Sequence, residues 1–448
     1  MKRKLYPKLL EWRNSPYRKP LILRGARQVG KSFLVREFGK NEFSDYIEIN
    51  FELQPELKNS FKDKKPERIL KNLELYLNRK IELENTILFL DEIQECPEAI
   101  LSLRYFHEQM PTLAVIAAGS LLEFALNSEE YRSPVGRIQF LYLYPLSFQE
   151  FLEAIGETIV LEFLHEVKLS DEFSSVVHEK LLNLYKDYLI VGGMPEAVKV
   201  YSETKNFSLV KQIQLSLLLT YRDDFSKYAG KIKQKYLEKV FYSIPTMLGK
   251  KIRYSEIDRE TPSRELKQAV ELLESAGVVN KIVGTNNAEL PLSYHAKENF
   301  YKLIFLDTGL SLKASGLEET ILTSPNILGV YEGGLAEQFV GQELIAYASP
   351  EERAKFFYWE RFKRGSSAEI DYLLIYKSEV YPVEVKAGKT GSLKSLKLYK
   401  GEMQNQISIR YSKLPLSYYE GLLSIPLYLI AETERLLEVI KSFNCNLR

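Results

Sequence analysis

The residues from Gly25 to Ser32 form a glycine-rich loop of the kind that holds phosphate groups. They fit the pattern G-x-x-x-x-G-K-S without a mismatch and are, in order, Gly25, Ala26, Arg27, Gln28, Val29, Gly30, Lys31 and Ser32. The glycines let successive amides point at phosphate oxygens, Lys31 can reach the β and γ phosphates, and Ser32 can ligate Mg²⁺. The pattern predicts ATP and Mg²⁺ as ligands. The alternative is an ordinary glycine turn before a helix.

Two acidic residues would supply the rest of a hydrolytic site. The apolar run Thr86 to Leu90 is followed directly by Asp91 and Glu92. Hydrolysis of a nucleoside triphosphate needs one carboxylate near the metal and a second that polarises the attacking water. We assign Asp91 to Mg²⁺ and Glu92 to the water. An apolar run that ends in Asp-Glu is common and by itself indicates little. Because this run follows a matching phosphate loop in the chain, it supports a hydrolytic site.

Two further residues are candidates for contact with the γ-phosphate. Ser120 follows the apolar run Leu113 to Ala118, so it would lie beside the phosphate as a sensor, unless it only caps the next helix. Arg137 could stabilise phosphoryl charge within the chain or in a neighbouring subunit. The alternative for Arg137 is a surface arginine that solvates a loop.

Near the C-terminus, a pattern of carboxylates and a lysine could also act on phosphate. Glu369 and Asp371 precede a second segment that ends with Glu384 and Lys386, like the D…E-x-K core of restriction-endonuclease-like folds. If a hairpin turns at residues 378–379, Asp371 lies opposite Lys386, and Asp371, Glu384 and Lys386 share one face. Two carboxylates could then hold Mg²⁺ while the lysine orients a water. The alternatives are a surface hairpin, or a nuclease fold retained as a binding platform.

The elements that must position these residues follow from the hydrophobic pattern. Four strand-sized apolar runs alternate with helix-length sequence, which predicts a parallel, helix-covered sheet to about residue 150. They are Leu21 to Leu23, Tyr46 to Phe51, Thr86 to Leu90 and Leu113 to Ala118. From Phe148 to about Tyr236 the periodicity is helical, with a turn signal at Gly192 to Pro195.

The second half begins with the order of a winged helix-turn-helix, from about Leu237 to Asp307. Its expected recognition helix, Ser263 to Ser275, has an acidic balance that disfavours reading of a DNA groove, so we expect a packing or partner-docking role. A helix after Gly333 and a hairpin around Ile370 to Lys386 follow.

Composition restricts the class of protein. The chain has 448 residues, of which 45% are hydrophobic, and Lys+Arg 61 against Asp+Glu 60 gives a net charge of +1. This balance excludes a protein that coats nucleic acid by bulk charge. Two isolated cysteines and four histidines without ligand spacing predict a reducing, cytoplasmic compartment and no zinc cluster. No 18-residue apolar span appears, so we expect no membrane insertion.

Basic residues gather in two places that could contact DNA. The first twenty residues are basic, and residues 361–400 contain nine Lys/Arg against four Asp/Glu. Arg361, Lys363 and Arg364 could meet a DNA backbone. A solvated N-terminal helix explains the first cluster equally well.

Taken together, these motifs resemble those of the prokaryotic AAA+ ATPases whose C-terminal half is an uncharacterised domain. The resemblance covers nearly the whole chain and lies in the phosphate loop with its strand, Asp91 to Gln94, Gly119-Ser120, Gly136-Arg137, Tyr144 to Phe151, Gly192 to Glu196, Phe305 to Leu310 and Glu384 to Lys386. It implies an ATP-binding core, a winged-helix middle and a nuclease-like tail of the PD-(D/E)XK type. It also implies that Glu337 is a further acidic residue of the tail site, with Asp371 and Glu384 as metal ligands.

The predicted fold class is α/β, in four parts. They are a P-loop NTPase core of AAA+/ASCE type over residues 1–150, a helical lid over 151–236, a winged-helix-like part over 237–325 and an α/β restriction-endonuclease-like domain over 326–448. We expect a Mg²⁺-dependent ATPase coupled to the nuclease-like domain and acting on or near nucleic acid. The alternative is a slow ATP-dependent switch or adaptor whose tail binds a partner without cleavage. A homo-oligomer or a protein partner fits either hypothesis.

Overall fold

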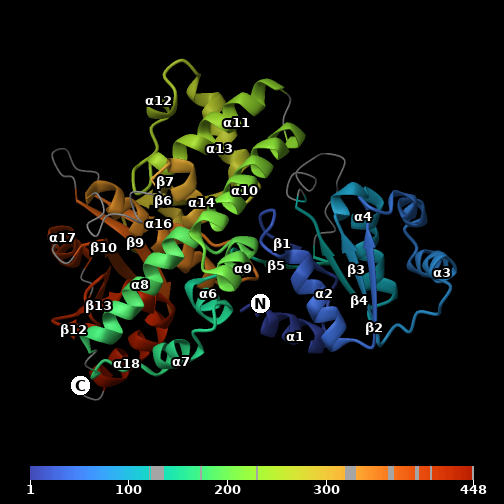
Figure 1. The fold of residues 1–448 in the computed structure, drawn as a ribbon, viewed down its shortest axis with the longest axis horizontal. Helices are drawn as coiled ribbons and strands as arrows, with labels where there is room; N and C mark the ends of the chain where they lie inside the picture. The colour runs from blue at the N-terminus through green and yellow to red at the C-terminus, as the bar shows by residue number, and fades with distance from the viewer. Residues whose placement is uncertain are drawn as a thin grey trace.

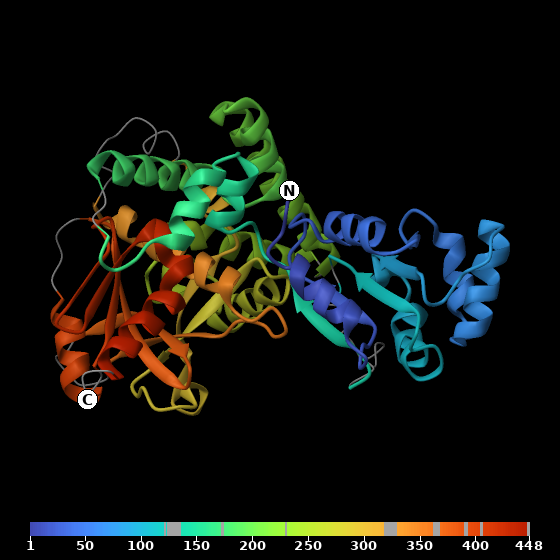
Figure 2. The ribbon, with the colours of Figure 1, turned by 90° about the horizontal axis from the view of Figure 1, so that it is seen from below.

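A computed structural model describes residues 1–120, 122, 136–171, 174–228, 231–317, 329–361, 368–388, 393–403 and 406–445. The molecule is elongated, with one β-sheet near each end and helices between them (Figures 1 and 2). Lys363 and Arg364, which we expected to meet a DNA backbone, lie outside the described residues. Among the helices that are described, none is long and apolar enough to cross a membrane.

The N-terminal sheet has five parallel strands in the order β2-β3-β4-β1-β5. The strands are β1 (Leu21–Arg24), β2 (Asp45–Asn50), β3 (Thr86–Asp91), β4 (Ala114–Ala118) and β5 (Gln139–Tyr142). The predicted parallel sheet and its first four strands are confirmed. The sequence analysis missed β5 because this edge strand has only one buried residue, Leu141, and therefore no apolar run.

Helices cover both faces of this sheet. They are α1 (Tyr6–Asn14), α2 (Lys31–Glu42), η1 (Pro55–Phe61), α3 (Pro66–Leu77), η2 (Ile93–Glu95) and α4 (Pro97–Gln109). Along β1, Leu21 and Leu23 pack into one buried cluster and Ile22 into another, as the alternation of side chains along a strand requires. The first cluster continues into the C-terminal half of the chain, so the two halves share one apolar core.

Helices follow the sheet, as predicted. They are α6 (Phe148–Ala154), α7 (Thr158–Glu166), α8 (Ser175–Val191), α9 (Pro195–Thr204), α10 (Phe207–Tyr228), α11 (Lys231–Ser243), η3 (Ile244–Thr246), α12 (Tyr254–Ile257) and α13 (Ser263–Ser275). In Figure 1, α6 and α9 lie near the centre of the molecule, and α11, α12 and α13 lie above β6 (Val279–Thr285) and β7 (Ala296–Phe305). The break between α8 and α9 is tight because a side chain on Gly192 or Gly193 would collide with Asp307 or with the carbonyl of Leu146.

The second sheet has eight strands in the order β12-β13-β11-β10-β9-β8-β6-β7. The strands are β6 (Val279–Thr285), β7 (Ala296–Phe305), β8 (Phe356–Glu360), β9 (Glu369–Tyr376), β10 (Glu379–Lys386), β11 (Ser408–Ser412), β12 (Ser417–Tyr419) and β13 (Leu422–Pro426). The β6–β7 hairpin follows α11, α12 and α13, and its strand β6 pairs with β8. The middle and the tail of the chain therefore share one sheet.

The remaining elements surround this sheet. They are η4 (Leu292–Tyr294), α14 (Thr308–Ser315), α16 (Gly329–Tyr347), α17 (Lys394–Met403), η5 (Leu427–Glu432) and α18 (Thr433–Cys445). Asp307 caps α14 by accepting a hydrogen bond from the backbone N–H of Leu310, and it also accepts one from the N–H of Gly193. One buried carboxyl thus ties the α8–α9 turn to the start of α14.

A second buried carboxyl joins α16 to α6. Glu343 is 1% exposed, and its Oε1 accepts a hydrogen bond of 2.9 Å from the N–H of Phe148. Burial raises the pKa of Glu343 to about 8, compared with about 4.3 for an exposed glutamate. Between these two pH values the folded state binds the extra proton, so this group makes the fold less stable as the pH rises.

We therefore expect Glu343→Gln to have little effect on the melting temperature at pH 5, where the native carboxyl is protonated. At pH 9 the variant should be more stable than the native protein, by on the order of a few kcal/mol, because the amide carries no charge to bury. Thermal unfolding at several pH values measures this difference. Glu162→Gln, at an exposed position of α7, is the control and should show no such trend. A gain that is equal at pH 5 and pH 9 would contradict the assignment.

Candidate functional site

The predicted phosphate loop connects β1 to α2 as its sequence requires. Gly25 and Gly30 have φ values of +142° and +94°, which residues other than glycine rarely adopt, and Gln28 has a φ of +64°. A Cβ on Gly25 would lie 2.1 Å from the carbonyl oxygen of Leu143. The loop therefore needs glycine at this position, and α2 begins directly at Lys31.

The lysine of the loop is held in place by the loop itself. Lys31 is 7% exposed, and its Nζ donates to the carbonyl oxygens of Gly25 and Ala26 at 2.9 and 2.8 Å. These bonds keep the ammonium beside the backbone amides at the start of α2. A phosphate at that helix end would meet both the amides and the lysine.

Ser32 and Asp91, the predicted magnesium residues, lie side by side. Ser32 Oγ donates to Asp91 Oδ1 at 3.0 Å, and Asn50 Nδ2 donates to Asp91 Oδ2 at 3.2 Å. Burial raises the pKa of Asp91, and the hydrogen bond from Ser32 opposes this shift. A hydroxyl and a carboxylate at this separation are the oxygen donors that Mg²⁺ prefers, so these residues fit the ion.

Glu92 and Ser120 also meet, although 28 residues separate them in the chain. Glu92 Oε2 accepts hydrogen bonds from the backbone N–H and the hydroxyl of Ser120, at 3.3 and 3.5 Å, and from Gln94 Nε2 at 2.8 Å. A Cβ on Gly119 would lie 1.9 Å from Gln94 Oε1, so glycine is needed between β4 and Ser120. Glu92, which we expect to polarise the attacking water, and Ser120, the candidate sensor, are therefore hydrogen bonded to each other.

Segments from elsewhere in the chain pack directly against the phosphate loop. Arg27 forms a two-bond ion pair with Asp224 of α10 at 2.9 Å, and the Tyr221 hydroxyl donates to the carbonyl of Arg27. Arg3 donates to the carbonyl of Val29 at 2.8 Å. The loop is thus held from two directions.

The turn between α13 and β6 closes over the loop from a third direction. A Cβ on Gly277 would lie 3.3 Å from the backbone nitrogen of Ala26 and 3.5 Å from its Cβ. The cavity that remains beside Gly25, Ala26 and Ser120 has a volume of about 30 Å³, and Gly277 and Arg353 line its other side. This volume is about that of one water molecule.

Arg137 lies away from these residues. It precedes β5, and the β5 residue Gln139 pairs with Leu21 at the first residue of β1, whereas the phosphate loop follows the last residue of β1. The Arg137 side chain is 49% exposed and pairs with Glu108 at 3.0 Å. Within one chain Arg137 is at the opposite end of the parallel strands from the loop. The cross-subunit role and the alternative of a surface arginine remain as predictions.

The C-terminal hairpin forms, but its turn is one residue earlier than expected. Lys377 and Ser378 have positive φ values, and the register pairs Glu379 with Tyr376 and Val383 with Tyr372. Continued by one residue, this register places Glu384, not Lys386, opposite Asp371. A shift of the pairing by two residues leaves every side chain on the same face, which is why hydrophobic alternation could not distinguish the two registers.

The predicted residues of the tail come together with lysines between them. Lys386 Nζ lies 2.5 Å from Glu384 Oε1, and Asp371 Oδ2 accepts from the N–H of Val385 at 2.8 Å. Lys302 Nζ lies 3.1 Å from Glu337 Oε2. Burial raises the pKa values of Glu337, Asp371 and Glu384. Across the described residues, no group of three or more acidic, histidine or cysteine side chains is placed to hold a metal ion.

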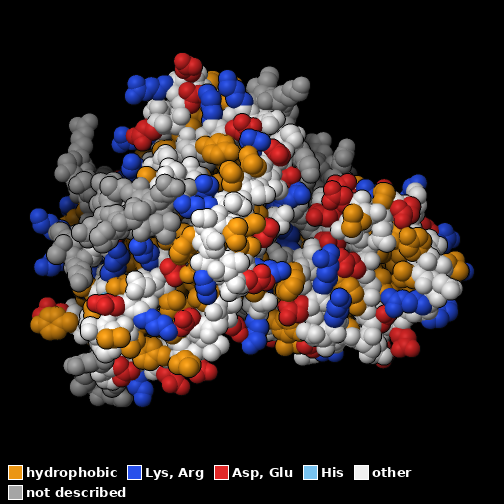
Figure 3. Space-filling view, viewed as in Figure 1, with side chains coloured by type: hydrophobic (Ala, Val, Ile, Leu, Met, Phe, Trp, Pro, Cys, Tyr) orange, Lys and Arg blue, Asp and Glu red, His pale blue; other side chains and the backbone are white. Residues whose placement is uncertain are grey.

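Several of the basic residues considered for DNA contact that the structure describes have partners within the chain. Arg361 pairs with Glu402, and in the N-terminal segment Lys2 pairs with Glu153 and Arg13 with Glu42. On the face shown in Figure 3, basic and acidic side chains are interspersed. The local sequence excess therefore does not become a single-sign surface on that face.

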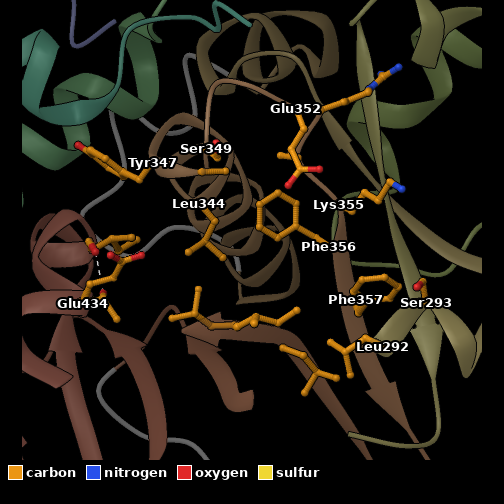
Figure 4. Close-up of a pocket in the computed structure, with 18 of the residues that line it drawn as sticks. Leu292, Ser293, Leu344, Tyr347, Ser349, Glu352, Lys355, Phe356, Phe357 and Glu434 are labelled. Atoms are coloured by element: carbon orange, nitrogen blue, oxygen red, sulfur yellow. Dashed lines mark hydrogen bonds between the residues drawn. The ribbon is translucent and has the colours of Figure 1, made fainter. Parts of the chain in front are cut away.

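A separate cavity of about 640 Å³ lies in the C-terminal half. Leu344, Phe356, Phe357 and Leu292 form apolar walls, and the charged residues at its edges include Glu352, Lys355 and Glu434 (Figure 4). The phosphate loop contributes no residue to its lining.

Sequence reasoning missed several residues that hold the site. Asn50 ends the strand beside β3, so its polar side chain at a carboxyl strand end was a usable signal. Arg3, Asp224 and Gly277 gave no such signal, because their contacts with the loop depend on packing between distant segments.

Comparison with known proteins divides the chain into three matched segments. Residues 17–152 match the family model of an AAA domain. Residues 182–320 and 332–428 match two domains of unknown function, DUF8612 and DUF4143. No curated protein matches the chain.

Solved structures give only distant likenesses. Orc1 of Aeropyrum pernix, in complex with DNA, is 13% identical over 71% of this chain and 91% of its own, with a TM-score of 0.26. The RuvB Holliday junction branch migration motor of Thermotoga maritima is 16% identical over 63% and 90%, with a TM-score of 0.30. PCH-2 of C. elegans is 12% identical over 42% and 56%, with a TM-score of 0.26.

The N-terminal third therefore matches an AAA domain and carries a phosphate loop on a parallel sheet. Two domains of unknown function follow it.

We expect Lys31→Ala to weaken ATP binding about tenfold or more, because it removes the charged donor beside the phosphates. Glu92→Gln should retain ATP binding while hydrolysis falls about 100-fold or more, since the amide cannot accept a proton from water. Equilibrium binding of a labelled ATP analogue and phosphate release measure the two effects. Lys40→Ala, at an exposed position of the same helix, is the control and should match the native protein. Native hydrolysis in either site variant would refute the assignment.

Proposed function

We propose that the protein is an ATP-dependent switch, in which binding and hydrolysis of ATP at the AAA domain change how that domain packs against the rest of the chain. The observation that carries this proposal is the closure of the phosphate loop. Segments from α10 and from the α13–β6 turn pack on the loop and leave a cavity of about 30 Å³ beside it.

The side chains of the site have the following roles in this proposal. Lys31 and the loop amides bind the β and γ phosphates, and Ser32 and Asp91 hold Mg²⁺, which when bound neutralises phosphate charge. Glu92 accepts a proton from the attacking water. Ser120, hydrogen bonded to Glu92, reports the state of the γ-phosphate to the end of β4.

The size of the cavity links nucleotide binding to movement. Small-molecule sites are commonly about 300–1,000 Å³, some tenfold larger than the space beside Gly25 and Ala26. In the proposed switch, the α13–β6 turn withdraws from the loop when ATP binds. ATP then favours the separated arrangement by its difference in affinity for the two states, and loss of nucleotide restores the packed one.

A reversible cross-link tests this coupling directly. The distance of 3.5 Å between Ala26 Cβ and an ideal Cβ on Gly277 is at the short end of the disulfide range of about 3.5–4.5 Å. We therefore expect a disulfide in the Ala26→Cys/Gly277→Cys variant to hold the turn on the loop. Oxidation should weaken ATP binding more than about tenfold, and dithiothreitol should restore it.

The reduced double variant and the two single variants under oxidant are the controls. They show whether a side chain at Gly277, whose φ is +72°, by itself weakens ATP binding. They also show whether oxidation of the native cysteines affects ATP binding. Equally tight ATP binding by the oxidised and reduced double variants, with the disulfide shown to be formed, would disprove the coupling.

For the C-terminal half, the adaptor hypothesis is favoured over metal-dependent cleavage of nucleic acid. Cleavage requires carboxylates that are free to hold a metal, whereas Glu384 and Glu337 are each paired with a lysine. We propose that this half holds a protein or nucleic-acid partner and changes its hold with the nucleotide state of the AAA domain.

The purified protein should accordingly leave supercoiled DNA intact in Mg²⁺ or Mn²⁺, with or without ATP. Gel electrophoresis of plasmid after prolonged incubation measures nicking. Nicking by the native protein that disappears in both Asp371→Ala and Lys386→Ala would contradict the adaptor hypothesis and favour a nuclease.

A further inference from the structure

A buried lysine lies at the centre of the acidic cluster in the C-terminal half. Lys302, on β7, is 2% exposed. Its Nζ lies 2.5 Å from Glu369 Oε1, 3.1 Å from Glu337 Oε2 and 3.7 Å from Asp371 Oδ1. Three carboxylates from α16 and β9 thus surround one ammonium, which comes from the hairpin that precedes them in the chain.

Burial of this ammonium is possible only because of these neighbours. An unpaired charge away from water costs several kcal/mol, and a buried pair is tolerated when its partners are close and hydrogen bonded. Lys302 Nζ lies within 3.7 Å of an oxygen of each of Glu337, Glu369 and Asp371, and these three carboxylates offset the cost of burying the ammonium.

The carboxylates around Lys302 have other partners as well. Glu369 also pairs with Lys251 at 2.9 Å, and Asp371 Oδ2 accepts from a backbone N–H. Next to them, Glu384 Oε1 pairs with Lys386. Glu384 Oε2 is the one carboxylate oxygen of this group that is buried without a hydrogen-bond partner in the described part of the chain.

These contacts do not fit a divalent metal ion. In proteins Mg²⁺ is held through one or two carboxylates, with waters completing its shell at roughly 2.1 Å. Here Lys302 Nζ already contacts an oxygen of each of Glu337, Glu369 and Asp371. An ion bound to Asp371 Oδ1 would also lie within about 6 Å of the Lys302 ammonium, where two buried positive charges repel strongly. The described residues likewise include no group of three or more side chains placed for a metal.

We propose that Lys302 is a built-in cation that takes the place of a divalent metal in this cluster, so that the C-terminal half keeps its acidic residues together without binding a metal ion. Lys302 holds β7, α16 and β9 in register by charge. The cluster then serves as a structural joint between the β6–β7 hairpin and the tail.

Replacement of the lysine should expose a cation site. Lys302→Met keeps a similar volume and removes the charge, so Glu337, Glu369 and Asp371 lose their common partner. We expect the melting temperature of nucleotide-free, full-length protein to fall by several degrees and Mn²⁺ to restore part of the loss. Electron paramagnetic resonance should detect one more bound Mn²⁺ per chain in this variant than in the native protein.

The native protein should show neither Mn²⁺ binding at the cluster nor stabilisation by Mn²⁺. Lys297→Met, at an exposed position of the same strand, is the matched control and should behave like the native protein. Binding to the native protein that is lost in Asp371→Asn but kept in Asp91→Asn would overturn the proposal, because it places a metal in the cluster despite Lys302. A Lys302→Met variant that folds and binds no Mn²⁺ would also overturn it.

A second variant covers the case in which Lys302→Met does not fold. Lys302→Met/Glu369→Gln removes one charge of each sign and keeps an oxygen ligand at position 369. We expect this protein to fold and to bind Mn²⁺ through Glu337 and Asp371. If it folds without binding Mn²⁺, the carboxylates do not form a cation site and the proposal fails.

Discussion

The packing of the phosphate loop against the C-terminal half is the contact on which the rest of the structure depends. The loop that begins α2 touches α10 through Arg27 and the α13–β6 turn through Ala26, and the two halves share one buried apolar cluster. Because protein cores are close packed, such a contact is bistable and does not deform gradually. In the proposed switch, a ligand that needs space at the loop acts on both halves through these contacts.

Buried charge is the second constraint, and it is met differently in the two halves. In the N-terminal domain, Asp91 accepts hydrogen bonds from Ser32 and Asn50, and the Arg36 guanidinium lies 3.7 Å from its Oδ2. In the C-terminal half, Glu337, Glu369 and Asp371 already surround Lys302. Similar residue types thus lie beside a phosphate loop in one half and around a buried lysine in the other.

The sequence predicted the structure best where a feature depends on residues that are close together in the chain. The phosphate loop, the strand that ends at Asp91 and the first four strands of the sheet were all predicted, since each rests on local spacing or alternation. The edge strand β5 was not predicted because it has no apolar run. The register of the β9–β10 hairpin was wrong by two residues, because alternation fixes the face of a side chain but not its opposite partner.

By itself, the sequence determined that a phosphate loop with two following carboxylates exists, because the chemistry of that loop is set by eight consecutive residues and a strand end. Only the tertiary structure decided what surrounds these residues. Glu92 meets Ser120, Gly277 covers Ala26, and Lys302 enters a cluster whose acids lie at least 35 positions further along the chain. Such contacts arise from how helices and strands pack, and the pattern of nearby residues does not encode them. The acidic tail motif therefore predicted a shared face correctly, while the cation within that face came from another part of the chain.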